Sequence, residues 1–308
     1  MLIKLPSKIG LIIKVAIVFI ALLYILSRFI LMDGGNLSFP TFLIALRVHP
    51  FLFYGTILLM PLNWFLESLK WKNAAGRAID ISLSNAVMGV LAGVTIGLAT
   101  PNRIGEFVGR VFMVKGGDRI QLLLLSSVSS FAQVLVTIML GLIGFVLHPE
   151  LAGLATIDLI LLFAGVFLVF SLPFIFRFIP YKWLKKIAVL RLFPRRLFAR
   201  ILLLSFLRYA VYVFQFCLIL SFYGIVLNLE LALVCIVISY FIVTIIPTFS
   251  FTEVFIRGGI AGIVFSNAGV SFNLAFAAAV TLWIINVAIP ALIGTVFVFK
   301  LKFYANEE

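Results

Sequence analysis

The chain has 308 residues, of which 64% are hydrophobic and only 11% are charged. So little polar surface cannot cover a soluble globule, and several apolar stretches reach the ~20 residues that a helix needs to cross a bilayer. We therefore expect an all-α, polytopic integral membrane protein. The net charge of +13 indicates membrane topology and attraction to anionic lipid rather than binding of nucleic acid, because no basic soluble face or RNA-binding motif accompanies it.

Six apolar stretches have the length of a full span, and we expect one transmembrane domain over 1–308. The spans are predicted at 12–31 (the segment 1–32 with its basic start), 51–69, 121–147, 155–177, 201–222 and 273–299. Lys and Arg collect at the N-terminus, at 70–77, 115–119 and 177–200, and after the last span. Positive residues favour the cytoplasmic side, so both termini are predicted to be cytoplasmic in a prokaryotic inner (plasma) membrane.

Two segments, 81–119 and 229–270, do not fit a single span. Residues 70–77 and 115–119 are both expected inside, so the chain between them crosses an even number of times. Its apolar part is long enough for one crossing at most, and a re-entrant helical hairpin satisfies both facts. The same count predicts a second hairpin at 229–270 that enters from the opposite face.

The two hairpins have related sequences. The first breaks at Pro101 and the second at Pro247, and each break is followed by three polar residues at i, i+3 and i+7, the spacing of one helix face. These residues are Arg103, Glu106 and Arg110 in the first hairpin and Ser250, Glu253 and Arg257 in the second. Segments 51–147 and 201–299 therefore predict an inverted-topology repeat. A linking span, 155–177, and a basic amphipathic cytoplasmic connector, 178–200, join the two halves, and the basic stretch 177–200 is expected to contact anionic phospholipids.

Broken helices at membrane depth are tolerated where they are buried in protein or face a watery cavity. Thr100 is predicted to cap a half-helix with Pro101 in its first turn, and Ser250 and Glu253 fit a capping box. The two half-helix N-termini and the arginines after them predict a substrate site for a phosphate-bearing headgroup.

The carboxylates of the two motifs have a simpler interpretation. Glu106 precedes Arg110 by four residues, as Glu253 precedes Arg257. In this alternative each glutamate neutralises its arginine and holds its hairpin in place, and neither residue binds a substrate. Arg103 has no equally obvious partner, which favours a ligand.

Six further polar residues are possible lining of the cavity: Asn63, Glu67, Gln133, Arg208, Tyr212 and Asn286. The alternative is that they form hydrogen bonds between helices. Trp64 is expected to mark the cytoplasmic interface. Two glycine pairs at i, i+4, Gly105 with Gly109 and Gly258 with Gly262, predict close helix contacts. Neither a metal site nor a cofactor is expected.

The first motif resembles a known family, the flippase-like transmembrane region of bacterial lysylphosphatidylglycerol synthetases and their stand-alone relatives. The matching residues are Thr100, Pro101, Gly105, Glu106 and Arg110, in the pattern Thr-Pro-x-x-x-Gly-Glu-x-x-x-Arg. The stretch ESLKW, the later Pro247 and the stretch AGVS at 268–271 fit the layout. The chain departs from the family after Pro247, where Phe249 and Phe251 replace a glycine-rich stretch.

The resemblance implies a lipid flippase that moves a phospholipid or polyprenyl phosphate through a central polar cavity. The sequence has no soluble aminoacyl-transferase domain, so a separate synthase or glycosyltransferase is an expected partner. It has no ATP-binding P-loop, so uphill transport requires an ion gradient or a partner. Two alternatives remain, an intramembrane polyprenyl-pyrophosphate phosphatase and a non-transporting envelope scaffold. Neither hairpin contains a histidine that could serve as nucleophile or general acid.

Overall fold

The computed structural model describes residues 39–100, 103–114, 116–152, 194–246 and 250–301, and four single positions nearer the N-terminus. The predicted linking span 155–177 and most of the first span and of the connector 178–200 lie outside the described residues. So do both predicted break points, Pro101 and Pro247. Within the described ranges the fold is all-helical.

Among the described residues, four helical segments are long and apolar enough to cross a membrane, and they match four of the six predicted spans. They are α3 (Pro50–Ala75), α6 (Arg119–Leu147), α9 (Arg195–Phe222) and the continuous segment Phe272–Val298. The last consists of α12 (Phe272–Trp283), the π-helical η5 (Ile284–Ala288) and α13 (Ile289–Val298). The predictions of an all-helical fold and of these four apolar helices, long enough to cross a membrane, are confirmed.

Shorter helices fill the two segments that did not fit a single span. They are α4 (Leu83–Leu98) with α5 (Gly105–Phe112), and α10 (Leu229–Ile245) with α11 (Ser250–Asn267). Side-chain oxygens cap the first helix of each pair, because Ser82 accepts a hydrogen bond from the Asn85 backbone (3.2 Å) and Asn228 from that of Leu231 (2.7 Å). The remaining described elements are α2 (Phe39–Val48), which packs on α3, and the short η2 (Pro149–Ala152).

Each pair of shorter helices begins and ends at one end of the bundle. In the first pair, Gly116 after α5 lies against Ile79 before α4. In the second pair, the connection 148–151 lies beside both ends. Its main chain accepts a hydrogen bond from Asn267 at the end of α11 (2.9 Å), and its histidine lies 3.9 Å from Glu230 at the start of α10.

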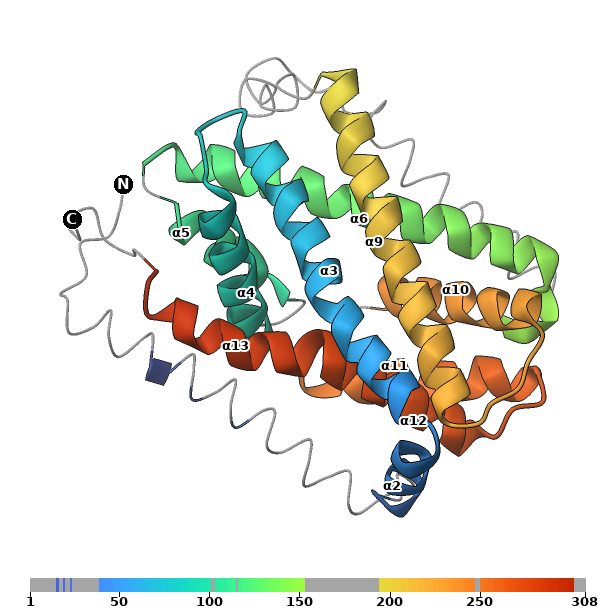
Figure 1. The fold of residues 1–308 in the computed structure, drawn as a ribbon. Coiled ribbons are helices and arrows are strands. Elements are labelled where there is room, and N and C mark those ends of the chain that lie inside the picture. The colour runs from blue at the N-terminus through green and yellow to red at the C-terminus, as the bar shows by residue number, and fades with distance from the viewer. Residues whose placement is uncertain are drawn as a thin grey trace.

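The two pairs start at opposite ends of the molecule. Helices α3 and α9 lie side by side and run in opposite directions (Figure 1). Phe53 near the start of α3 packs against Phe222 at the end of α9, with ring centroids 5.5 Å apart. Since one pair follows the end of α3 and the other follows the end of α9, their first residues lie at the two ends of the molecule.

The two halves of the chain support each other. Helix α6 packs on α10, and α13 packs on α4, so the last long helix of each half covers the first short helix of the other. Glycines make both contacts close: Gly141 lies against Phe241, and Gly294 lies against Leu91. Thr95 in α4 also donates a hydrogen bond to the Ala291 carbonyl in α13 (2.7 Å).

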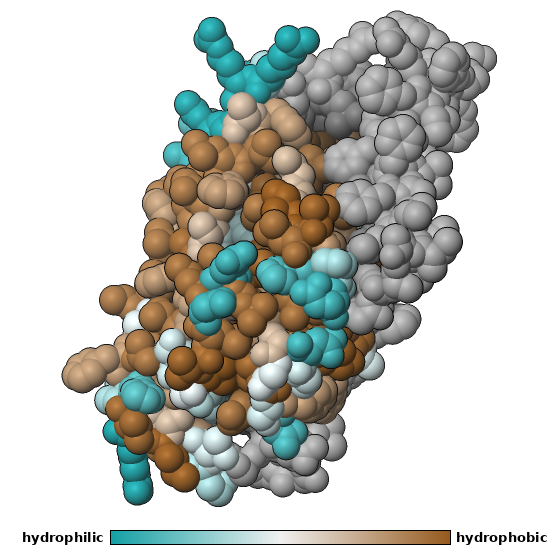
Figure 2. Space-filling model, turned by 90° about the vertical axis from the view of Figure 1, so that its right-hand side faces the viewer, coloured by the Kyte–Doolittle hydropathy of each residue, from teal (hydrophilic) through white to brown (hydrophobic). Residues whose placement is uncertain are grey.

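The outer surface of the long helices is apolar. Phe51 and Leu58 of α3 are 88% and 78% exposed, and similar residues project from α6, α9 and α13. Figure 2 shows one face of the molecule largely covered by hydrophobic residues, with hydrophilic ones at its top and bottom and a smaller group between them. Exposed apolar area of this extent is typical of a surface that faces lipid.

The predicted glycine contacts are confirmed. A Cβ atom on Gly109 would overlap the backbone of Gly93 in α4, and one on Gly105 would lie 2.6 Å from the Ile96 carbonyl oxygen. In the second half, Gly258 and Gly262 face the rings of Phe276 and Phe272. Helix α5 therefore lies directly on the backbone of α4.

We expect Gly109→Ala to destabilise the protein, because the neighbouring group is backbone and cannot move aside as a side chain can. Overpacking of this kind costs about 1–3 kcal/mol. Gly259→Ala is the matched control, since a Cβ at this helical glycine meets nothing within 4 Å; it should leave stability unchanged or raise it by up to ~1 kcal/mol. Thermal unfolding of the detergent-solubilised protein measures both, and equal midpoints for the two variants would contradict the close α4–α5 contact.

Candidate functional site

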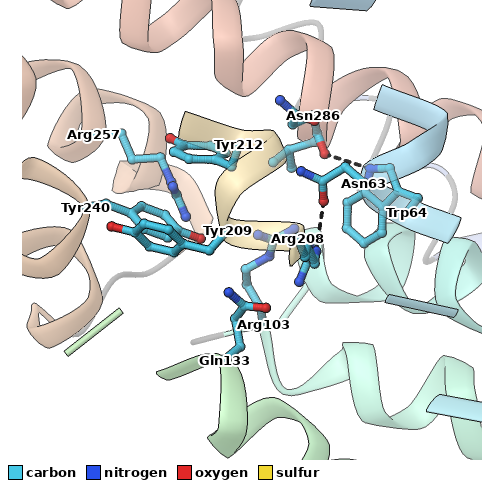
Figure 3. Close-up of a pocket in the computed structure, with 11 residues that line it drawn as sticks. Asn63, Trp64, Arg103, Gln133, Arg208, Tyr209, Tyr212, Tyr240, Arg257 and Asn286 are labelled. Carbon is cyan, nitrogen blue, oxygen red and sulfur yellow. Dashed lines mark hydrogen bonds between the residues drawn. The ribbon is translucent and has the colours of Figure 1, made fainter. Parts of the chain in front are cut away.

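A cavity of about 60 Å³ lies where the two halves of the chain meet, and both halves contribute residues to its wall (Figure 3). Its lining comes from α3, α6, α9, α10, α11, η5 and the connection between α4 and α5. The residues are Asn63, Trp64, Arg103, Gln133, Arg208, Tyr209, Tyr212, Tyr240, Arg257, Asn286 and Val287. Three guanidinium groups from three different elements therefore border one small space.

Glu67 is the centre of the polar network behind the cavity. Its carboxylate accepts hydrogen bonds from Lys70 Nζ (2.9 Å) and Arg208 Nη1 (2.7 Å), and it lies 3.0 Å from Arg110 Nη2. These cations belong to α3, α9 and α5. The Glu67 and Lys70 side chains are fully buried, so the carboxylate holds three helices together through charge.

Two further carboxylates extend this network to α11. Glu106 lies 3.4 Å from Arg110 and 2.9 Å from Arg103. Glu253 accepts a hydrogen bond from Arg257 Nε (2.9 Å) and lies 3.5 Å from Arg103 Nη1. The predicted i, i+4 pairs are confirmed, whereas the expectation that Arg103 lacks a partner is wrong: it bridges Glu106 and Glu253.

The network carries more positive than negative charge. Five cations, Lys70, Arg103, Arg110, Arg208 and Arg257, share three carboxylates, Glu67, Glu106 and Glu253, which leaves two positive charges without a counter-ion among the described residues of the network. Uncompensated charge inside a bundle of apolar helices is unfavourable. The site is therefore suited to an anion.

The backbone at Arg103 is unusual. Its φ angle is +56°, in the left-handed region that residues other than glycine seldom adopt. Helix α5 begins only at Gly105, so the predicted single stripe of Arg103, Glu106 and Arg110 on one helix is wrong. The left-handed turn before the helix is the feature that directs Arg103 toward the cavity and toward Glu253.

Thr100 connects the two helices of the first pair, but it is not the N-cap of α5. Its hydroxyl accepts a hydrogen bond from the Gly105 backbone (2.8 Å) and lies 3.2 Å from the Ile96 carbonyl near the end of α4. The N-cap position belongs to Ile104. In the second motif, the side chain of Ser250 lies outside the described residues, and Glu253 occupies the first turn of α11.

Arg110 was predicted to bind substrate, yet the structure places it behind the cavity. Its side chain is 2% exposed, and Nη1 lies 3.4 Å from the hydroxyls of both Ser126 and Ser130 in α6. Arg208, which was predicted only as possible lining, borders the cavity in its place. Arg110 thus supports Glu67 and Glu106 without facing the cavity.

The amide side chains line the cavity and also join helices. Asn63 accepts a hydrogen bond from Arg208 Nε (2.8 Å), Gln133 donates to the Ser205 carbonyl (3.3 Å), and Asn286 donates to Gln215 (3.1 Å). These three residues therefore line the cavity and also form hydrogen bonds between helices, which are the two roles that the sequence left open. Asn286 lies in η5, a π-helical turn just before Pro290, and such turns are frequent at functional sites.

Aromatic residues form the rest of the wall, and the sequence prediction missed most of them. Tyr212 was predicted, and it stacks on Tyr240 with centroids 4.6 Å apart. Arg257 lies over the Tyr240 ring (5.7 Å) and Arg208 over the Trp64 ring (5.0 Å). Trp64 is buried and donates to the Asn286 carbonyl (3.1 Å), so its assignment to the membrane interface is wrong.

Guanidinium groups with free N–H edges can hold phosphate, carboxylate or sulfate through paired hydrogen bonds. Among the described residues that line the cavity there is no His, Ser, Cys, Asp or Glu. The lining is thus equipped to bind an anion. Comparison of the chain with protein-family models, with curated proteins and with solved structures found no match.

We expect Glu67→Gln to lower the free energy of unfolding by about 3–5 kcal/mol, because it leaves buried cations without their carboxylate. Adding Lys70→Met should restore part of the loss, since it removes one of those charges. Glu150→Gln, at an exposed carboxylate beside His148, is the control and should change stability by less than about 0.5 kcal/mol. Thermal unfolding in detergent measures all three; strictly additive losses in the double variant would contradict the charge network.

Proposed function

We propose that this protein is a lipid transporter that moves a phosphate-bearing headgroup across the membrane, while the hydrocarbon chains stay in the bilayer. The observation that carries the proposal is the surplus of two positive charges around a cavity enclosed by apolar helices. A buried surplus of charge is costly unless a ligand of opposite charge uses it. Such a site at the meeting point of two half-chains is typical of secondary transporters.

The arrangement of the helix pairs supports transport over static binding. We propose that α4–α5 and α10–α11 are re-entrant hairpins of an inverted-topology repeat. Each pair starts and finishes at its own end of the bundle, and the packing partners exchange between halves, as α6 covers α10 and α13 covers α4. Rocking of such repeats around a fixed central site gives alternating access.

The proposal extends to the class of protein and to its setting. We propose that the chain is related to the flippase-like transmembrane region of the lysylphosphatidylglycerol synthetases and lies in a prokaryotic inner membrane with cytoplasmic termini. A separate synthase or glycosyltransferase would supply or use the lipid. The basic residues Lys72, Arg77, Arg196 and Arg200 favour this orientation, because they border one hollow at the end of α3 and the start of α9.

We expect Arg103→Gln and Arg257→Gln each to reduce the rate of lipid movement at least tenfold, because each removes a guanidinium from the cavity. The assay reconstitutes the protein in vesicles that contain a fluorescent phospholipid or polyprenyl phosphate and follows its accessibility at the outer leaflet. Arg47→Gln, the same exchange at an exposed position of α2, should move lipid as the parent does.

Two results would contradict the proposal. If both cavity variants moved lipid as fast as the parent, the arginines would have no role in transport. If the vesicles released inorganic phosphate from a polyprenyl pyrophosphate at a rate that depends on Arg103, the protein would be a phosphatase. Fluorescence-detected gel filtration of each variant establishes that a loss of rate is not a loss of folded protein.

A further inference from the structure

We infer that the cavity selects a terminal phosphate dianion, the group of a lipid phosphate monoester, over the phosphodiester of an ordinary glycerophospholipid. This inference deepens the proposed function and rests on it. It depends on three independent features of the site: its charge, the donors it leaves unused, and its size and shape.

The charge of the site matches a dianion. The five cations and three carboxylates of the network leave two positive charges over. A phosphate monoester carries about −1.5 to −2 at pH 7, because its second pKa is about 6. A phosphodiester carries a single negative charge and would leave one of the two buried charges uncompensated. The monoester therefore neutralises both surplus charges, whereas the phosphodiester neutralises only one.

Two of the residues that line the cavity carry a donor that the described part of the protein does not use. Arg103 engages Glu106 and Glu253 through Nε and Nη1, and its Nη2 is buried without a hydrogen-bond partner among the described residues. The hydroxyl of Tyr209, a residue only 2% exposed, is likewise buried and unpaired within the described part of the chain. Burying such groups unpaired is unfavourable, so their presence at a cavity wall indicates a ligand with several acceptor oxygens.

The remaining guanidinium groups are held in fixed orientations. Arg208 is fixed by Asn63, Glu67 and the ring of Trp64. Arg257 is fixed by Glu253 and lies over Tyr240. Each of the two has at least one terminal nitrogen beyond those used in these hydrogen bonds. Together with Arg103 they approach from three elements, which suits the three free oxygens of a terminal phosphate.

The size of the cavity also favours a terminal group. A volume of about 60 Å³ holds roughly four waters, at ~15 Å³ of such volume for each. A phosphate with one substituent can enter such a space from its open side. A phosphodiester has bulky groups on both sides of the phosphorus and two free oxygens, so it cannot present three acceptors to the three arginines.

The test compares two lipids that differ in one methyl group. The protein is placed in phosphatidylcholine nanodiscs, and the affinities of dodecyl phosphate and methyl dodecyl phosphate are measured by isothermal titration calorimetry at pH 8 and pH 5. We expect the monoester to bind at least tenfold more tightly at pH 8. The preference should fall below threefold at pH 5, where the monoester carries one charge. The diester reports any titration of the protein itself.

Two variants locate the effect in the cavity. Tyr209→Phe should weaken binding of the monoester three- to tenfold, because it removes the unused hydroxyl. Tyr54→Phe makes the same change on the exposed outer face of α3 and should have no effect.

Each outcome decides the inference. Equal or tighter binding of the diester at pH 8, or no measurable binding of either probe, overturns it. Transport that depends on Arg103 and Arg257 would then still support the proposed function. Conversely, a clear monoester preference in a protein that moves no lipid would retain the dianion site and reject the transporter.

Discussion

The structure depends on the cost of placing charge inside a bundle of apolar helices. Glu67 offsets much of this cost, because its buried carboxylate forms ion pairs with Lys70, Arg110 and Arg208 from three different helices. Four charged side chains on three helices can be placed inside the bundle only when they lie together, so the network fixes how α3, α5 and α9 pack. The glycines of α4 and α5 contribute to the same arrangement, since their close contact places Arg110 next to Glu67.

Within the described residues, the helix pair α10–α11 joins this network through one residue of the first half. Arg103 leaves the regular helix geometry with a positive φ angle and reaches Glu253, 150 residues further along the chain. It also lies 2.9 Å from Glu106 in its own half. A single guanidinium therefore connects the two helix pairs at the point where they approach each other. Because it borders the cavity as well, whatever binds there acts on the contact between the halves.

Features that depend on neighbouring residues were predictable from the sequence, whereas contacts between distant parts of the chain were not. The long apolar runs predicted four of the helices, and the i, i+4 spacing predicted Glu106 with Arg110 and Glu253 with Arg257, because both follow from helix geometry alone. The partner of Arg103 depends on the packing of two halves, which no spacing records. Tyr240 and Trp64 lie in runs where aromatic residues more often face lipid or the interface, so nothing in their surroundings assigns them to a polar wall.

Arg103 contributes to the excess of positive charge and also bridges the two helix pairs. In the structure Arg103 Nη1 lies 3.5 Å from Glu253, the longest ion pair of the network, whereas Arg257 holds the same carboxylate at 2.9 Å. Under the proposed function, an anion in the cavity competes with Glu253 for Arg103 and leaves the pair between Glu253 and Arg257 in place. Binding would thus weaken the link between the halves without unpairing a buried carboxylate. A ligand changes a conformational equilibrium only through a difference in its contacts between two states. Arg103 is the side chain at which such a difference can arise.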